Sequence, residues 1–178
     1  VLQKSRAVLD DFDTFVRSIP VISIDDVETI VKQSVNTNND FQILTDTRKL
    51  SRYINRLVTN DTFQVGNRVI SVCNNAVKET LNGNIGFISF WGIDECWVQY
   101  PHKEVRYLPY ELHQFEHAYS ITIHKSQGSE YDSGIIFLSN PRMLTKELLY
   151  TAVTRFKSSV KIFIVKSSRN KRRGVKIA

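Results

Sequence analysis

The chain has 178 residues, 42% of them hydrophobic and 24% charged, and this composition predicts a folded domain with a sizeable core rather than a disordered chain. Its formal net charge of +6 favours polyanionic partners such as nucleic acid but does not prove one. Two cysteines are too few for a disulfide framework or a cysteine-based zinc site, which fits a reducing cytoplasm. No apolar run approaches the roughly 18–20 residues that cross a bilayer, so no membrane partner is expected.

The first predicted elements are helical. Apolar residues recur at helical spacing over residues 2–19, which predicts one helix, and a second short helix follows with a capping box of Ser23 and Asp26. The apolar run 41–44 predicts a buried strand, and the one-sided apolar spacing of residues 48–58 predicts the helix after it. Strand, turn and helix in this order are half of a βαβ unit.

Between residues 63 and 116 the pattern changes to short β-type runs separated by turns that carry Asn, Gly and Pro. Strands are predicted over residues 68–72, 85–91, 96–100 and 105–108. Asp94 and Glu95 fall in a hairpin turn between two of these strands. This segment therefore predicts a small β-barrel inserted into an α/β domain.

The α/β pattern returns at Ala118. It predicts a strand ending at Ile123, a second strand over 134–138, a helix over 146–153 and a last strand over 160–165. Buried strands that alternate with helices are typical of a mostly parallel sheet, so the predicted fold class is α/β. The basic stretch 169–176 is predicted to be a C-terminal tail.

The most informative segment is 118–132, a predicted strand that ends at a turn rich in hydrogen-bond donors. The carboxyl end of a parallel sheet is where such a turn grips a ligand. Gly128 lets the backbone approach a ligand closely. The side chains that can donate to phosphate oxygens are those of Thr122, His124, Lys125, Ser126 and Gln127.

A second segment, 147–155, is a predicted helix that ends at Arg155, directly before the last strand. A guanidinium stays protonated and donates in a planar fork, which suits a developing negative charge. Considered alone, an arginine at a helix end is more often a solvated or ion-paired residue.

The two segments together resemble a known family. Thr-x-His-Lys-Ser-Gln-Gly-Ser-Glu over 122–130, followed after about twenty residues by Leu-Leu-Tyr-Thr-Ala-Val-Thr-Arg over 148–155, closely resembles motifs V and VI of superfamily 1 helicases, above all the RecD and TraA branch. The run 42–48 resembles motif IV more loosely, and 65–86 resembles the stretch that opens the inserted barrel in RecD-type proteins. The resemblance covers roughly residues 41–166.

The resemblance implies a RecA-like domain with an inserted SH3-like barrel, and a role for each matched residue. It implies that Arg155 is a catalytic arginine finger that reaches the γ-phosphate of ATP, with Arg48 as a second phosphate contact. Gly128, Ser129 and Glu130 are expected beside the nucleotide. The residues expected to contact single-stranded DNA are Thr122, His124, Lys125, Ser126 and Gln127. Phe156 stands where many relatives have Ala, and Asn67 where they often have Asp, but neither change removes a charged ligand.

The 178 residues contain no Gly-x-x-x-x-Gly-Lys-[Ser/Thr] and no predicted Walker B strand. ATP and Mg²⁺ are therefore expected to be held mainly by a preceding RecA-like domain of the same polypeptide, and the fragment alone is expected to be inactive. Other subunits of a helicase–nuclease complex are further expected partners. No metal site is predicted, because the histidines lack ligand spacing.

Two interpretations from other classes stay open at this stage. The chain could be a non-catalytic nucleic-acid-binding or protein-interaction module derived from a helicase, or the domain of an RNA helicase, since phosphate contacts do not distinguish DNA from RNA. Aromatic residues of the insert could stack on bases, with Trp97 and Tyr107 as the candidates, although small barrels also need aromatic residues in their cores.

The predicted domain boundaries follow the change of pattern. Residues 1–62 are assigned to N-terminal helices and the first part of the RecA-like domain, 63–116 to the inserted barrel, 117–166 to the rest of the RecA-like domain, and 167–178 to the basic tail.

Overall fold

The computed structural model describes residues 1–35, 40–139 and 144–166, so the predicted tail at 169–176 lies outside the described residues. The elements are, in chain order, α1 (Leu2–Asp10), α2 (Phe12–Ser18), β1 (Val21–Ile22), α3 (Ile24–Ser34), β2 (Phe41–Thr45), α4 (Arg48–Thr59), β3 (Arg68–Ser71), β4 (Ile85–Trp91), β5 (Cys96–Tyr100), β6 (Lys103–Tyr107), the 3-10 helix η1 (Pro109–Gln114), β7 (Phe115–His117), β8 (Ser120–Thr122), β9 (Tyr131–Leu138), α5 (Lys146–Val153) and β10 (Phe156–Val165).

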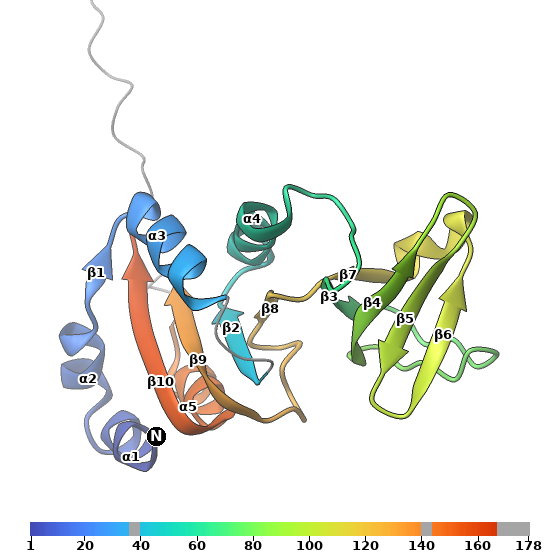
Figure 1. The fold of residues 1–178 in the computed structure, drawn as a ribbon. Helices are drawn as coiled ribbons and strands as arrows, with labels where there is room; N and C mark the ends of the chain where they lie inside the picture. Colours follow the sequence, from blue (N-terminus) through green and yellow to red (C-terminus); the bar gives the residue numbers. More distant parts are fainter. Residues whose placement is uncertain (36–39, 140–143, 167–178) are drawn as a thin grey trace, which may run out of the picture.

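A parallel sheet forms the larger part of the molecule. Its strands lie in the order β1-β10-β9-β2-β8, and every neighbouring pair is parallel. Side chains alternate between its two faces: Ile136 and Leu138 of β9 pack with α1 and α5, whereas Ile135 and Phe137 pack with α3 and α4. Figure 1 shows the resulting three layers. The predicted α/β class with a parallel sheet is confirmed.

Local sequence explains the helix boundaries. The Ser23 hydroxyl accepts from the Asp26 amide while the Asp26 carboxylate accepts from the Ser23 amide, so the predicted capping box starts α3. The single helix predicted over 2–19 is wrong, because the chain breaks at Asp11, whose φ of −145° is not helical. The Asp11 carboxylate accepts from the Thr14 amide and thereby starts α2 as a separate helix.

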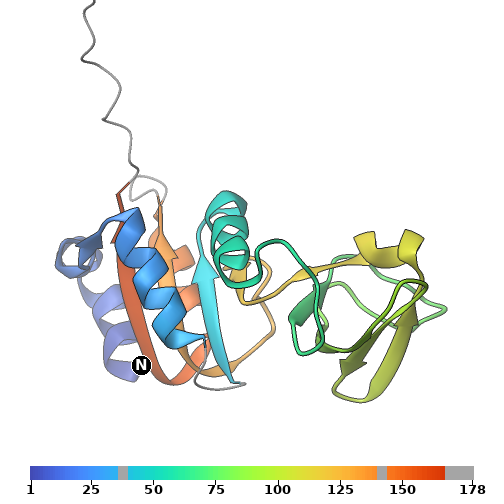
Figure 2. The same cartoon turned by 45° about the horizontal axis from the view of Figure 1, so that its top comes forward.

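The segment between α4 and β8 forms a second, antiparallel sheet in the order β6-β5-β4-β3-β7. The strand pairing of the described residues leaves β6 and β7 as outer strands, so the expectation of an SH3-like barrel is not confirmed. Figures 1 and 2 both place this sheet beside the β8 edge of the parallel sheet. It has its own core, and we call it the antiparallel unit.

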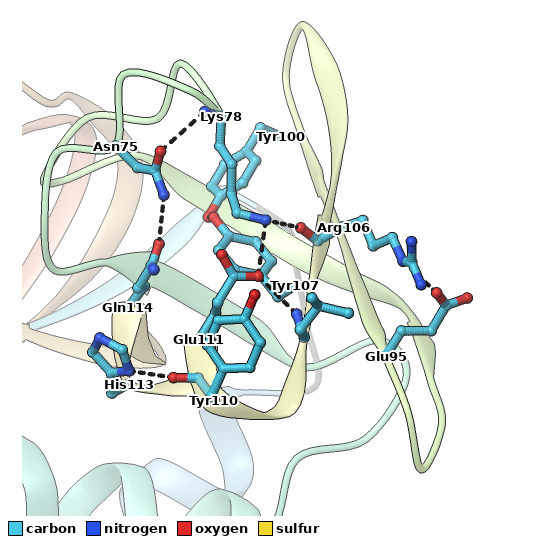
Figure 3. Close-up of polar contacts among 11 residues, drawn as sticks. Asn75, Lys78, Glu95, Tyr100, Arg106, Tyr107, Tyr110, Glu111, His113 and Gln114 are labelled. Atoms are coloured by element: carbon cyan, nitrogen blue, oxygen red, sulfur yellow. Dashed lines mark hydrogen bonds and ion pairs between the residues drawn. The ribbon is translucent and has the colours of Figure 1, made fainter.

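The loop between β3 and β4 is fastened onto the antiparallel unit by Lys78 (Figure 3). The Lys78 ammonium lies 3.0 Å from the Glu111 carboxylate and 4.9 Å from the centre of the Tyr107 ring, and it also donates to the carbonyl of Arg106. Both side chains of the ion pair are less than one-fifth exposed. Because the ammonium meets a carboxylate, a carbonyl and a ring face together, its burial is compensated.

Side chains of β3 and α4 fix the antiparallel unit to the parallel sheet. Arg68, at the start of β3, is buried and donates to the Phe41 carbonyl at 2.8 Å. Asn55 of α4 donates to the carbonyls of His117 and Ser120 and accepts from the Ser120 amide, each at 2.8–2.9 Å. These bonds hold the strand that enters β8, so the edge of the parallel sheet has a defined position.

Gly134 of β9 provides a test of the sheet packing. A Cβ built there would lie 2.0 Å from the Gln42 carbonyl oxygen and 2.3 Å from the Phe156 ring. Because a backbone oxygen cannot move aside cheaply, Gly134→Ala is expected to lower the free energy of unfolding by more than about 3 kcal/mol. The neighbouring Ser133→Ala is expected to stay within about 0.5 kcal/mol. Urea unfolding of both variants measures the difference, and similar midpoints would contradict this packing.

Candidate nucleotide and nucleic-acid sites

The turn predicted to be rich in hydrogen-bond donors lies in segment 123–130, which runs from one edge of the parallel sheet to the other. We call the first part of this segment, residues 123–127, the donor turn. Segment 123–130 leaves β8 at the carboxyl edge and enters β9 at the amino edge, because both strands run parallel to β2 between them. At a rise of about 3.3 Å per residue, the five-residue strand β2 separates the two edges by roughly 15 Å. The predicted site residues therefore fall into two groups.

The first group lines a hollow of about 230 Å³ between α4, β8 and the antiparallel unit, which we call the basic hollow. This volume is below the roughly 300–1,000 Å³ of small-molecule pockets, which fits a local contact with a larger ligand. Three cationic side chains and one carboxylate line it: Arg48, Arg52, Lys125 and Glu116. Asn82, from the loop between β3 and β4, and Thr122 line it as well.

The turn after β8 is built on Thr122. Its hydroxyl accepts from the Lys125 amide at 3.3 Å, and its carbonyl accepts from the Ser126 amide at 3.1 Å. His124 and Gln127 are exposed, as phosphate contacts require. The Ser126 hydroxyl is fully buried and donates to the Ile123 carbonyl at 2.8 Å, so the predicted DNA contact of this side chain is wrong.

The second group lies at the amino edge, around the end of α5. Arg155 directly precedes β10, and its carbonyl accepts from the Tyr131 amide at 2.8 Å. Its half-buried guanidinium donates to the Thr151 and Ser129 carbonyls at 3.1 and 3.3 Å. None of the salt bridges within the described ranges involves Arg155. Neutral carbonyl groups therefore hold the charged guanidinium of Arg155 beside segment 128–130.

Gly128, Ser129 and Glu130 lead from the donor turn to this edge. Gly128 has a φ of +85°, a left-handed conformation that glycine adopts without strain. The Glu130 carboxylate lies 3.2 Å from the Lys157 ammonium, and both side chains are more than 60% exposed. Such an exposed pair contributes at most about 1 kcal/mol, so Glu130 can exchange partners readily.

Arg48 and Arg155, both predicted to contact the nucleotide, lie at different edges of the parallel sheet. Arg48 begins α4 directly after the carboxyl end of β2, and it lines the basic hollow with Lys125. Arg155 lies at the opposite edge. Arg48 follows β2, which ends at the carboxyl edge, whereas Arg155 follows α5, which runs back to the amino edge where β10 begins.

The aromatic candidates of the antiparallel unit are also separated. Tyr107 is 0% exposed, and its hydroxyl lies 2.9 Å from that of Tyr100 in the core, so the predicted contact between Tyr107 and DNA is wrong. Trp97 is half-buried and its indole N–H donates to Glu95 at 3.1 Å, which leaves part of the ring accessible. Its base contact stays a prediction.

Sequence reasoning missed Arg52, Asn82 and Glu116. Arg52 was recognisable, because it follows Arg48 by four residues and therefore lies on the same face of α4. Asn82 and Glu116 reach the basic hollow only through the pairing of the antiparallel unit, which periodicity does not specify. The described residues contain no group of three His, Cys, Asp or Glu side chains placed to hold a metal ion, and no helix long and apolar enough to cross a membrane.

Comparison with known proteins finds a similarity that includes the donor turn. Residues 117–162 match the model of the UvrD-like helicase C-terminal domain. This segment is similar to a UvrD-like helicase C-terminal domain. It contains β8, the donor turn, β9, α5, Arg155 and most of β10, so both groups of site residues draw on it.

Relatives of the UvrD-like segment extend the match along the chain. The RecBCD enzyme subunit RecD of Buchnera aphidicola subsp. Schizaphis graminum is 31% identical over 114 residues, which are 61% of this chain and 19% of that protein. The ATP-dependent RecD2 DNA helicase of Deinococcus radiodurans is 29% identical over 92 residues, 51% of this chain and 13% of that protein. The chain thus spans about a fifth or less of these relatives and resembles the C-terminal part of a RecD-type helicase.

Solved structures agree on the fold. Pif1 helicase from Bacteroides, in complex with ADP-AlF3 and ssDNA, superposes with a TM-score of 0.62 at 16% identity, over 89% of this chain and 48% of that one. Pif1 helicase from Candida albicans gives 0.59 at 12% identity, over 91% and 52%. At these identities the likeness shows a shared fold, that of a RecA-like helicase domain.

His117, at the edge of the basic hollow, predicts a pH dependence of stability. Its ring stacks on Phe63 at 4.2 Å and its Nε2 lies 3.1 Å from the Thr62 carbonyl oxygen. Burial lowers the pKa of His117, and the bond to Thr62 only partly opposes this. His117 therefore binds a proton more tightly in the unfolded chain than in the folded one. The contribution of neutral His117 to the stability of the fold is present above pH of about 6.5 and is lost as pH falls through the folded pKa.

The expected result is a melting temperature that falls between pH 7.5 and 5.5, and a smaller fall in His117→Gln than in the unaltered chain. Exposed His102 provides the matched control, and His102→Gln is expected to leave the fall unchanged. Equal falls in all three proteins would show that His117 does not titrate with unfolding.

Proposed function

We propose that the chain is the C-terminal motor domain of an ATP-dependent DNA helicase or translocase. In this proposal the amino edge contacts nucleotide and the basic hollow at the carboxyl edge contacts a single strand. The observation that carries it is the separation of two cationic sites on one RecA-like domain, joined by segment 123–130. The relatives named for ATP-dependent unwinding, and a fold neighbour captured with a nucleotide mimic and ssDNA, support it.

Arg155 fits the phosphate end of a nucleotide. Its guanidinium is charged, half-buried and bonded only to neutral groups in the described part of the chain, so it has donor capacity for an anion. As an arginine finger it would stabilise the charge that develops during phosphoryl transfer. Gly128, Ser129 and Glu130 would lie beside the same nucleotide.

Other parts of the machinery would come from outside these residues. The sequence lacks a phosphate-binding loop, so a preceding RecA-like domain would hold most of the ATP together with Mg²⁺, and this chain alone would not hydrolyse ATP. The chemistry supplied there is metal-assisted phosphoryl transfer. The likeness to RecD subunits makes partners in a helicase–nuclease complex part of the proposal.

The basic hollow would hold the phosphate backbone of a single nucleic-acid strand. Lys125 and Arg48 supply positive charge, and exposed His124 and Gln127 supply donors on the same turn. We therefore reassign Arg48 from the nucleotide to the strand. Contacts of this kind depend on the charge of the phosphates and not on the base sequence. Binding is therefore expected to weaken steeply as the salt concentration rises.

The test compares Arg155→Ala with the unaltered protein in the full-length polypeptide, by strand-stimulated ATP hydrolysis. Loss of an arginine finger is expected to lower the hydrolysis rate by about 10³–10⁵-fold while single-strand affinity changes little. Arg155→Lys should recover little, because lysine lacks the planar fork. Lys161→Ala, an exposed charge removal on β10, is the matched control.

Unchanged hydrolysis in Arg155→Ala would contradict the arginine finger. If the full-length protein hydrolyses no ATP but still binds strands, the non-catalytic module is the better interpretation. Stimulation by RNA rather than DNA would favour an RNA helicase.

A further inference from the structure

The basic hollow contains one negative charge among its cations. Glu116 lies 3.2 Å from Lys125, and the two side chains are 51% and 27% exposed. Arg48 and Arg52 take part in none of the salt bridges within the described residues, so the carboxylate is directed to Lys125 alone. A site built only to attract phosphate would gain nothing from this carboxylate.

The position of Glu116 is fixed by strand pairing. Glu116 lies opposite Ile70 in the register of β7 and β3, and both side chains line the basic hollow. Its neighbour Phe115 points into the core of the antiparallel unit, as alternation along a strand requires. The carboxylate is therefore held by the antiparallel sheet, whereas its partner Lys125 belongs to the turn after β8.

We propose that Glu116 is a built-in competitor of the nucleic-acid backbone: it occupies the Lys125 ammonium in the free protein, and a strand phosphate takes its place on binding. Arg52, one turn after Arg48 on α4, is the third cation of the same phosphate site. This inference rests on the proposed function of the basic hollow. Its consequence is a weaker hold on the phosphate at Lys125, which allows release when the domain moves along a nucleic-acid strand.

The exchange has a signature in the salt dependence of binding. A lysine that neutralises a phosphate releases a counterion from the strand, but the freed Glu116 carboxylate recruits a cation in return. The net ion release at Lys125 is then close to zero. Removal of the carboxylate charge should therefore steepen the slope of log K against log salt by about 0.7, the value for one single-strand phosphate contact.

The experiment measures fluorescence anisotropy of a labelled oligothymidine of about twelve nucleotides with nucleotide-free full-length protein at several salt concentrations. Glu116→Gln is expected to raise affinity about two- to fivefold at low salt, the range that an exposed ion pair allows, and to steepen the slope. Glu28→Gln removes the same charge from the exposed pair with Lys32 on α3 and should do neither. Glu116→Ser is a second variant if Glu116→Gln folds poorly.

The double variant Glu116→Gln with Lys125→Met isolates the proposed pair. The gain from Glu116→Gln must vanish when Lys125 is absent, because the competitor then has nothing to occupy. Arg52→Met should weaken binding and reduce the slope by about 0.7. Arg56→Met, one turn further along α4, is its matched control, because Arg56 pairs with Asp61 and does not line the hollow.

Two failures are distinguishable. If Lys125→Met binds the strand as tightly as the unaltered protein, the basic hollow is not the strand site and the proposed function fails there. If Lys125→Met weakens binding but Glu116→Gln behaves like Glu28→Gln, the strand site stands and the competitor is refuted. A gain that persists without Lys125 would also overturn the competitor.

Discussion

The parallel direction of β8, β2 and β9 governs the arrangement of both sites. A chain that leaves the carboxyl end of β8 can start β9 only at the amino edge, so segment 123–130 has to run from one edge to the other. Eight residues make this passage without a helix. The donor turn at its start thus lies in the basic hollow, and Glu130 at its end lies next to β9 and Arg155. One short segment carries residues of both sites.

The antiparallel unit completes the basic hollow rather than forming a separate attachment. β3 and β7 bring Ile70 and Glu116 to the hollow, and the loop held by Lys78 brings Asn82. Asn55 ties the start of β8 to α4 with two hydrogen bonds and the end of β7 with a third. Because the hollow has walls from α4, β8 and this unit, a movement between the two sheets would change the spacing of its charges.

Much of the fold follows from local chemistry in the sequence. The capping box of Ser23 and Asp26 and the β-type runs of β4 and β5 specify elements that form as predicted, whereas β9 begins three residues earlier than its apolar run predicted. The break at Asp11 was missed because apolar spacing continues across it, and the side-chain bond to Thr14 competes with that pattern. β1 has two residues, too few for any period to be visible.

The candidate sites could be predicted from the sequence only in part. Motifs indicate which residue types carry charge, but not which edge of a sheet each reaches. Arg48 and Arg155 both suit a phosphate, and only the direction of the elements that precede them separates them. Tyr107 and Trp97 lie on neighbouring paired strands, yet Tyr107 faces the core and Trp97 the opposite side. Burial of this kind depends on which face of an antiparallel sheet is covered, and that is a property of the assembled unit.

In the proposed function, one edge of the domain contacts nucleotide and the other edge contacts a single strand. The most direct test is the coupling between nucleotide binding and single-strand binding in the full-length protein. Single-strand affinity is measured with and without ADP and aluminium fluoride, and a coupling of about fivefold or more is expected. Gly128→Ala strains segment 123–130 without a steric clash, whereas Gly66→Ala applies the same strain elsewhere. The account predicts that Gly128→Ala reduces the ratio of the two affinities and that Gly66→Ala leaves it unchanged. Equal ratios in all three proteins would contradict a connection through this segment.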